Sequence, residues 1–271
     1  MTGTGADGAQ TGGQSVARIV ILLRTLPAGI GEVLAPVAPS VAQSLHGAPV
    51  SRIEVTVNGV PVTFHLRSEP LRARELDYAV AQSPLKELVS EAVARHVAHL
   101  VVSVEAPTDV FDAHHVVSQL GAAFAQENGL AVWLPDADLA TTDVMYVGEV
   151  SERPALNWFH TMAARLDETA SIAHTIGLGR FGAPDVQLVS SVLAPAEAHA
   201  ALRDAVAGIL EARRVPEAGD SVQVAGVASV LTPGQSRLGM PVVLDVVTAP
   251  PPDGEAPSAG RGPKRRWFGG R

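Results

Sequence analysis

The dipeptide Asn58-Gly59 constrains the fold more than any other feature, because it lies between two runs in which apolar and polar residues alternate. The runs are Arg52–Val57 and Val60–Leu66. Alternation with a period of two is typical of strands that bury one face. Asn-Gly also accepts the positive φ angles that a type I′ turn needs at both central positions. The sequence therefore predicts an antiparallel hairpin at this place.

Segments with strand and helix patterns surround this hairpin. Prolines interrupt the first helical segment at Pro36 and Pro39 and the second at Pro84. The order β-α-β-β-α-β predicts a ferredoxin-like, or split β-α-β, topology with helices packed on a mostly antiparallel sheet. The expected elements are a strand at 17–23, a helix at 30–45, the hairpin at 52–66, a helix at 75–96 and a strand at 99–105.

The chain beyond residue 105 predicts a different order. An amphipathic helix is expected at 109–128, with Asp109 near its N-cap, and a strand follows at 130–134. The C-terminal half then predicts β-β-β-α-β-β, and the sequence leaves open whether the two halves share one sheet. Its elements are expected as strands at 156–166, 170–178 and 186–192, a helix at 195–214, and strands at 222–231 and 240–247.

Composition divides the α+β chain into four parts. Residues 1–15 hold Gly, Thr, Ala and Gln with a single charge, which predicts a disordered N-terminus. Residues 16–150 form the ferredoxin-like half and residues 151–248 form the C-terminal α+β half. Residues 249–271 begin with a proline-rich stretch that predicts a semi-extended linker, and they end in a basic-aromatic tail.

Residue usage excludes several classes of protein. Apolar residues make up 46% of the chain, which is enough to build a sizeable core. The chain has no cysteine, which excludes disulfides, thiolate metal sites and cysteine nucleophiles and fits a cytoplasmic location. We expect neither a signal peptide nor a transmembrane segment. The bias toward Ala, Gly, Arg and Pro is typical of bacterial genomes of high GC content.

Charge is distributed unevenly along the chain. The net charge is −8, yet residues 261–271 carry five positive charges and no acidic residue, so the remainder carries −13 (−8 minus 5). An acidic body repels phosphates, and we therefore expect no nucleic-acid binding by the folded part.

The tail contains the segment Lys264-Arg265-Arg266-Trp267-Phe268, which we call the basic-aromatic segment. Cations beside aromatic side chains suit an acidic protein groove, an anionic membrane surface or RNA. The segment could also fold back on its own acidic body or bind a second copy. The alternative is a solubilising end, although an exposed Trp-Phe pair is unusual for that role.

Several short stretches together resemble a known family. They are Val57–Val62, Ala98–Val102, His174-Thr175-Ile176-Gly177-Leu178 and Phe181-Gly182-Ala183-Pro184-Asp185. They are similar to proteins with the domain of unknown function 4261, in which a His-Thr-x-Gly-Leu segment leads into a Phe-Gly-x-Pro-acid segment. The similarity covers most of the body and is strongest over about 150–247. It implies a fold and no activity, because the family is uncharacterised.

The glycines Gly177, Gly179 and Gly182 have the spacing G-x-G-x-x-G. A dinucleotide site needs a helix after such a loop, with the pyrophosphate at the N-terminus of that helix. Residues 183–188 instead alternate like a strand. The three glycines therefore predict a structural turn between two strands rather than a phosphate loop.

Two histidines and one acidic residue are weak candidates for catalysis. If residues 167–169 form a three-residue turn, Met162 lies opposite His174 and His160 lies diagonal to it on the same face, about 7–8 Å away. Such a pair could act with Asp185 in acid–base chemistry or hold a metal ion. The alternative is that each histidine is a half-buried strand residue with a structural hydrogen bond. No third ligand is fixed by spacing, so we expect no metal and no cofactor.

The sequence favours a non-enzymatic interaction or accessory protein. Its partner would be another protein, bound with help from the basic-aromatic segment, and a homo-oligomer is compatible with this reading. A small-molecule or metal-dependent enzyme that uses His160, His174 and Asp185 is the alternative.

Overall fold

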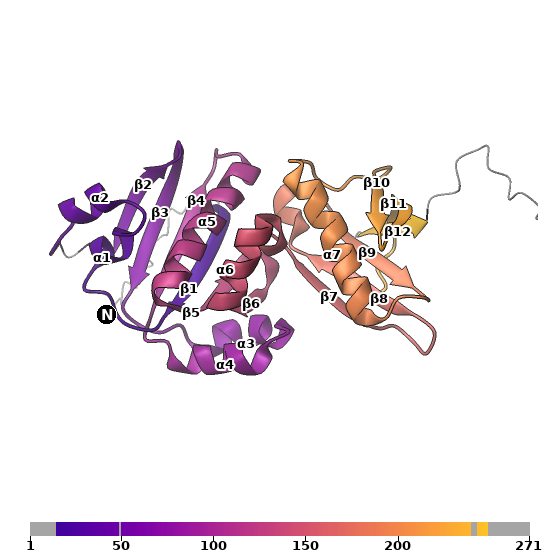
Figure 1. The fold of residues 1–271 in the computed structure, drawn as a ribbon, viewed down its shortest axis with the longest axis horizontal. Coiled ribbons are helices and arrows are strands. Elements are labelled where there is room, and N and C mark those ends of the chain that lie inside the picture. The colour runs from indigo at the N-terminus through magenta and orange to yellow at the C-terminus, as the bar shows by residue number, and fades with distance from the viewer. Residues whose placement is uncertain (1–14, 49, 240–242, 249–271) are drawn as a thin grey trace, which may run out of the picture.

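The computed structural model describes residues 15–48, 50–239 and 243–248 and contains two six-stranded sheets (Figure 1). The fold is α+β and both sheets are dominated by antiparallel pairs, as the sequence predicts. The first half and the C-terminal half have separate sheets, a point that the sequence leaves open. The predictions for residues 1–14 and 249–271 lie outside the described residues, and Ser15 already belongs to a strand.

The first sheet has the strand order β2-β3-β4-β1-β5-β6, and all its neighbouring strands are antiparallel. The predicted hairpin is confirmed: Val57 pairs with Val60, and φ is 52° at Asn58 and 84° at Gly59. The strands are β1 (Ser15–Leu23), β2 (Arg52–Val57), β3 (Val60–Arg67), β4 (Ala98–Glu105), β5 (Gly129–Leu134) and β6 (Leu139–Thr142).

The ferredoxin-like topology is not confirmed. A split β-α-β unit needs parallel strands on either side of its helix, whereas β1 and β2 are antiparallel, because three antiparallel pairings separate them. Each expected helix is in fact a pair of shorter helices. A helix pair can return the chain to the end of the sheet that it left, so the next strand runs antiparallel. The pairs are α1 (Ile30–Leu34) with α2 (Pro39–Ser44), and α3 (Ala73–Gln82) with α4 (Lys86–Arg95).

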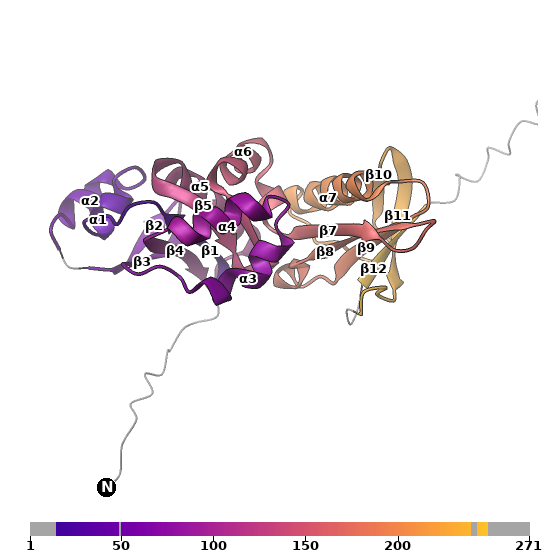
Figure 2. The same cartoon turned by 90° about the horizontal axis from the view of Figure 1, so that it is seen from below.

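Helices cover both faces of the first sheet (Figures 1 and 2). On β1, Ile19 and Ile21 pack with α1, α2, α5 (Val110–Asn128) and α6 (Asp143–Glu152). Val20 and Leu22 face the opposite way and pack with α3 and α4. A strand that is buried on both faces needs a continuous apolar run. The run at 17–23 therefore reflects a three-layer arrangement.

The second sheet has the order β10-β11-β12-β9-β8-β7, in which only the β12–β9 pair is parallel. Helix α7 (Pro195–Glu211) lies along one face of it (Figure 2) and buries Leu202 and Val206 with Leu188 and Ala173 of the sheet. The strands are β7 (His160–Arg165), β8 (Ser171–Ile176), β9 (Asp185–Ser190), β10 (Ser221–Val224), β11 (Val227–Gly234) and β12 (Val243–Thr248).

Two expected strands have other boundaries in the structure, and two elements were not expected. The strand expected at 222–231 is two strands, because Ala225 and Gly226 form a turn with φ of 50° and 77°. Alanine rarely adopts positive φ, so Ala225 gives no signal for a two-residue turn with Gly226. The strand expected from residue 156 begins only at His160, after the 3₁₀ helix η2 (Pro154–Asn157). Finally, β6 and α6 follow β5 without having been expected.

Candidate functional site

The 174–185 segment forms the connection between β8 and β9, with the 3₁₀ helix η3 (Leu178–Phe181) at its centre. Gly177 and Gly182 have φ of 110° and 77°, which glycine adopts without strain, whereas Gly179 has no such φ. A Cβ atom on Gly177 would lie 2.9 Å from the carbonyl oxygen of Asp136, which belongs to the first half. Strand β9 follows the turn, so the helix that a dinucleotide site requires is absent at this place.

Asp185 holds this connection together. Its Oδ1 accepts hydrogen bonds from the Thr175 hydroxyl (3.1 Å) and the Leu178 backbone N–H (3.2 Å). The Thr175 oxygen in turn accepts from the Val186 N–H at 2.8 Å. Burial raises the pKa of Asp185, and these two hydrogen bonds oppose that rise. The Oδ1 atom of the carboxylate thus contributes to fixing the turn.

The two candidate histidines lie where the predicted register puts them. Met162 pairs with His174 and His160 pairs with Ile176, so the two positions are diagonal in the strand register. Their electrostatic surroundings differ. Burial lowers the pKa of His174, and the nearby Asp185 opposes this. Burial lowers the pKa of His160 to about 4, with a further decrease from His199 and Arg203.

His199 and Arg203 are neighbours of His160 that sequence reasoning missed. Both lie on α7, and Arg203 forms a partly buried ion pair with Glu149 at 2.7 Å. No spacing rule connects α7 with β7, so only the packing of the helix on the sheet reveals this group. Among the described residues, no group of three or more His, Cys, Asp or Glu side chains is placed to hold a metal ion. In that same part of the chain, no helix has the length and apolar character needed to cross a bilayer.

An aromatic cluster joins the two halves. His114 on α5 stacks on Phe181 of η3 with 4.7 Å between ring centroids, and Trp158 lies 5.8 Å from His114. The Trp158 indole N–H donates to the Ser118 hydroxyl at 3.0 Å. Burial, with a smaller effect of Arg180, lowers the pKa of His114 to about 3, so the ring is neutral at physiological pH.

Ion pairs between the halves flank this cluster. Arg180 of η3 pairs with the buried Asp136, whose pKa is raised by burial and lowered in part by Arg180. On the other side, Arg213 pairs with Asp109 at 2.8 Å and with Asp112 at 2.7 Å, both near the start of α5. The 174–185 segment is therefore part of the contact between the two sheets.

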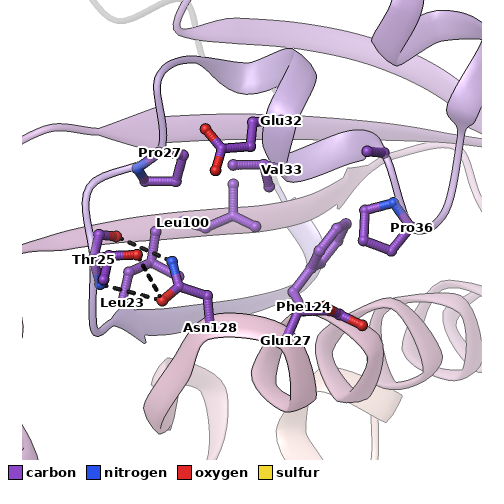
Figure 3. Close-up of a pocket in the computed structure, with 11 residues that line it drawn as sticks. Leu23, Thr25, Pro27, Glu32, Val33, Pro36, Leu100, Phe124, Glu127 and Asn128 are labelled. Carbon is purple, nitrogen blue, oxygen red and sulfur yellow. Dashed lines mark hydrogen bonds between the residues drawn. The ribbon is translucent and has the colours of Figure 1, made fainter.

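One candidate for ligand binding is a pocket of about 370 Å³ between α1 and the end of α5, shown in Figure 3. We call it the α1–α5 pocket. Leu23, Leu100 and Phe124 line its apolar floor. Glu32 on α1 and Glu127 on α5 line it from opposite sides (Figure 3), and both are exposed. The remaining lining residues are Thr25, Pro27, Val33, Ala35, Pro36 and Asn128, so none of the described residues that line the pocket is a cation.

Hydrogen bonds connect the lining residues at one end of this pocket. The side-chain oxygen Oδ1 of Asn128 accepts from the Thr25 N–H and hydroxyl, and the Asn128 side-chain NH₂ donates to the Thr25 backbone carbonyl at 3.0 Å. Glu32 accepts from the Ala28 N–H at 2.6 Å through Oε2. A second pocket of about 520 Å³ lies between α1 and α2 and shares Glu32 and Ala35 with the first. Sequence reasoning missed both pockets, since their residues come from separate elements.

The basic-aromatic segment, which the sequence predicts to bind a partner, lies outside the described residues. No protein-family model, no curated protein and no solved structure matches the chain. The similarity to the domain of unknown function 4261 therefore stays a prediction that rests on the short motifs.

Proposed function

We propose that this protein is an interaction protein that binds a partner through the α1–α5 pocket. The bound element would be a peptide segment in which an aromatic side chain is flanked by Lys or Arg. The observation that carries this proposal is the composition of the pocket: an apolar floor and two exposed carboxylates, with no cation among the described residues that line it.

Size and charge select this class of ligand. Pockets that bind small molecules have volumes of about 300–1,000 Å³, and 370 Å³ lies near the lower limit of that range. Aromatic side chains bury a large area for few rotatable bonds, and they dominate the energetics of many interfaces. Cations next to the aromatic residue would meet Glu32 and Glu127, for which no ion pair is found within the described residues. The acidic balance of the chain outside residues 261–271 supports the same preference.

The enzyme alternative receives less support from the site geometry. Asp185 is engaged with Thr175 and Leu178, and His160 has its charged neighbours on α7. Other features of the proposal rest on the sequence alone. The absence of cysteine supports a cytoplasmic location. The acidic body supports a protein partner rather than nucleic acid, and the motif at 174–185 supports membership of the uncharacterised family.

Binding to an array of decapeptides tests this function. The array should contain peptides with Trp or Phe beside two or three Lys or Arg, together with versions in which Glu replaces the cations. We expect the full chain to bind a subset of the basic peptides and none of the acidic versions. The double variant Glu32→Gln, Glu127→Gln should weaken that binding about 2- to 30-fold, because it removes two exposed ion pairs that contribute about 0.2–1 kcal/mol each.

The matched control is Glu54→Gln, Glu217→Gln, which removes two exposed carboxylates outside the pocket. The control should bind like the original chain. Equal weakening by both double variants would mean that only the overall charge attracts the peptides. No binding to any peptide of the array would refute the proposed function.

A further inference from the structure

We infer that the α1–α5 pocket receives the basic-aromatic segment Lys264–Phe268 of a second copy of this chain, so that copies associate head to tail. This inference rests on the proposed function and names one occupant of the same pocket. The segment contains the two features that the pocket selects, because Lys264, Arg265 and Arg266 directly precede Trp267 and Phe268.

Charge complementarity is the first support. The pocket presents Glu32 and Glu127, and no cation lines it within the part of the chain that the structure describes, whereas residues 261–271 contain five cations and no acidic residue. Both charges belong to the same chain: residues 261–271 carry +5, and the remaining residues carry a net −13 (−8 minus 5). Two chains therefore attract each other when the tail of one approaches the pocket of the other.

The second support is the position at which the described chain ends. From that position the tail reaches the pocket of another copy more easily than the pocket of its own chain. Strand β12 ends at Thr248 in the second sheet, whereas α1 lies at the far end of the first sheet (Figures 1 and 2). Residues 249–263 would span about 20 Å as a flexible coil and about 46 Å as a fully extended polyproline II helix. A sphere containing as many residues as the two halves is already about 45 Å across, and this molecule is elongated. A chain could reach its own pocket only with its linker at full extension.

The geometry of this contact predicts its assembly behaviour. The pocket and the tail are different surfaces, so each copy uses one to bind the copy ahead and the other to bind the copy behind. Such heterologous contacts extend to rings or open chains rather than stopping at a dimer. The size of the assembly should therefore grow with protein concentration, and it should decrease with added salt, since exposed charges are screened.

Complementation between two variants tests the inference in sedimentation velocity experiments with full-length chains. One variant, Trp267→Ala with Phe268→Ala, keeps its pocket and loses its aromatic residues. The other, Glu32→Lys with Glu127→Lys, keeps its tail and loses the acidic rim. We expect the original chain to exceed the dimer at high concentration and each variant alone to stay monomeric. A mixture of the two variants should form dimers and stop there, because one functional pocket meets one functional tail.

The control variant Glu54→Lys with Glu217→Lys should assemble like the original chain, and circular dichroism should show that all variants are folded. A labelled peptide of residues 262–271 should bind the tail variant at least tenfold more tightly than the pocket variant. A monomeric original chain at every concentration, or a mixture that fails to form dimers, would overturn the inference. If other basic peptides of the array bind the pocket while the 262–271 peptide does not, head-to-tail assembly is refuted and the proposed function stands.

Discussion

The two sheets of this protein are buried in different ways. The first sheet has helices on both faces, and Ile21 and Leu22, which point to opposite faces of β1, are each 0% exposed. The second sheet packs against α7 on one face. On β9, Leu188 faces α7 with 6% exposure, while its neighbour Val189 is 41% exposed on the other face. The number of covered faces determines how much apolar sequence a strand needs.

The face of the second sheet that α7 does not cover also buries polar side chains. The second sheet buries His174 and Gln187 on the face opposite α7, where Gln187 donates to the Gln235 carbonyl at 2.8 Å and to Asp245. The Arg237 N–H donates to the Gln187 side-chain oxygen at 3.1 Å. These bonds tie the stretch after β11 onto the sheet. On the face of the second sheet opposite α7, this hydrogen-bonded stretch covers part of the sheet in place of a helix.

The largest expected effect is on stability, and it tests whether both faces of β1 but only one face of β9 are buried. Ile21→Ala and Leu22→Ala should each lower the free energy of unfolding by about 2–5 kcal/mol, because both leave cavities between a sheet and helices. On β9, Leu188→Ala should cost a similar amount, whereas Val189→Ala should cost less than about 1 kcal/mol. Urea denaturation measures all four values. Equal costs for the two β9 variants, or a small cost for either β1 variant, would contradict the comparison.

A smaller effect is expected from the polar cover of the second sheet. Gln187→Leu removes the donor to Asp245 and the acceptor of the Arg237 N–H, and it should lower the free energy of unfolding by about 1–3 kcal/mol. Gln223→Leu on the exposed side of β10 is the matched control, and it should change that free energy by less than about 0.5 kcal/mol. Hydrogen exchange should show faster opening of residues 235–239 in the Gln187 variant alone. Unchanged exchange there would show that these bonds do not hold the loop.

The smallest effect concerns acid stability. His160 has a folded pKa of about 4 because of its burial and the nearby His199 and Arg203, while an unfolded histidine titrates near 6.5. The unfolded chain therefore binds more protons between these values, and stability falls as the pH decreases through this window. From pH 7.5 to 5.5 this histidine should account for a loss of about 1 kcal/mol.

The variant His160→Gln should accordingly lose about 1 kcal/mol less than the original chain between those two pH values. His115→Gln, at an exposed position of α5, is the control and should lose as much as the original chain. Urea denaturation at both pH values gives the differences. An identical loss in all three chains would show that His160 titrates alike in the folded and unfolded states.

Local patterns predicted much of the secondary structure. Asn58-Gly59 sets its own hairpin, because the turn conformation depends on those two residues. The three-residue turn at 167–169 likewise predicted the pairing of Met162 with His174. The turn at Ala225-Gly226 was missed, since alanine gives no signal for positive φ. The sequence also marked the breaks near Pro36 and Pro84, but the consequence of those breaks for strand order was not recognised.

For the candidate sites, too, the sequence identified single residues but not the distant residues that surround them. His160, His174 and Asp185 were identifiable as polar residues in strands, yet their neighbours were not, since His199 and Arg203 lie on α7. The pocket lined by Glu32 and Glu127 had no signature at all, because its floor and rim come from β1, β4, α1 and α5.

By itself, the sequence determined the compositional class, the separation of charge between body and tail, the main hairpin and most strands and helices. These properties depend on residues that are close together in the chain. Tertiary structure decided the strand order, the separation into two sheets, the number of covered faces and the α1–α5 pocket. Each of these depends on which distant segments pack together, and that choice is made by the burial of whole faces rather than by any local pattern.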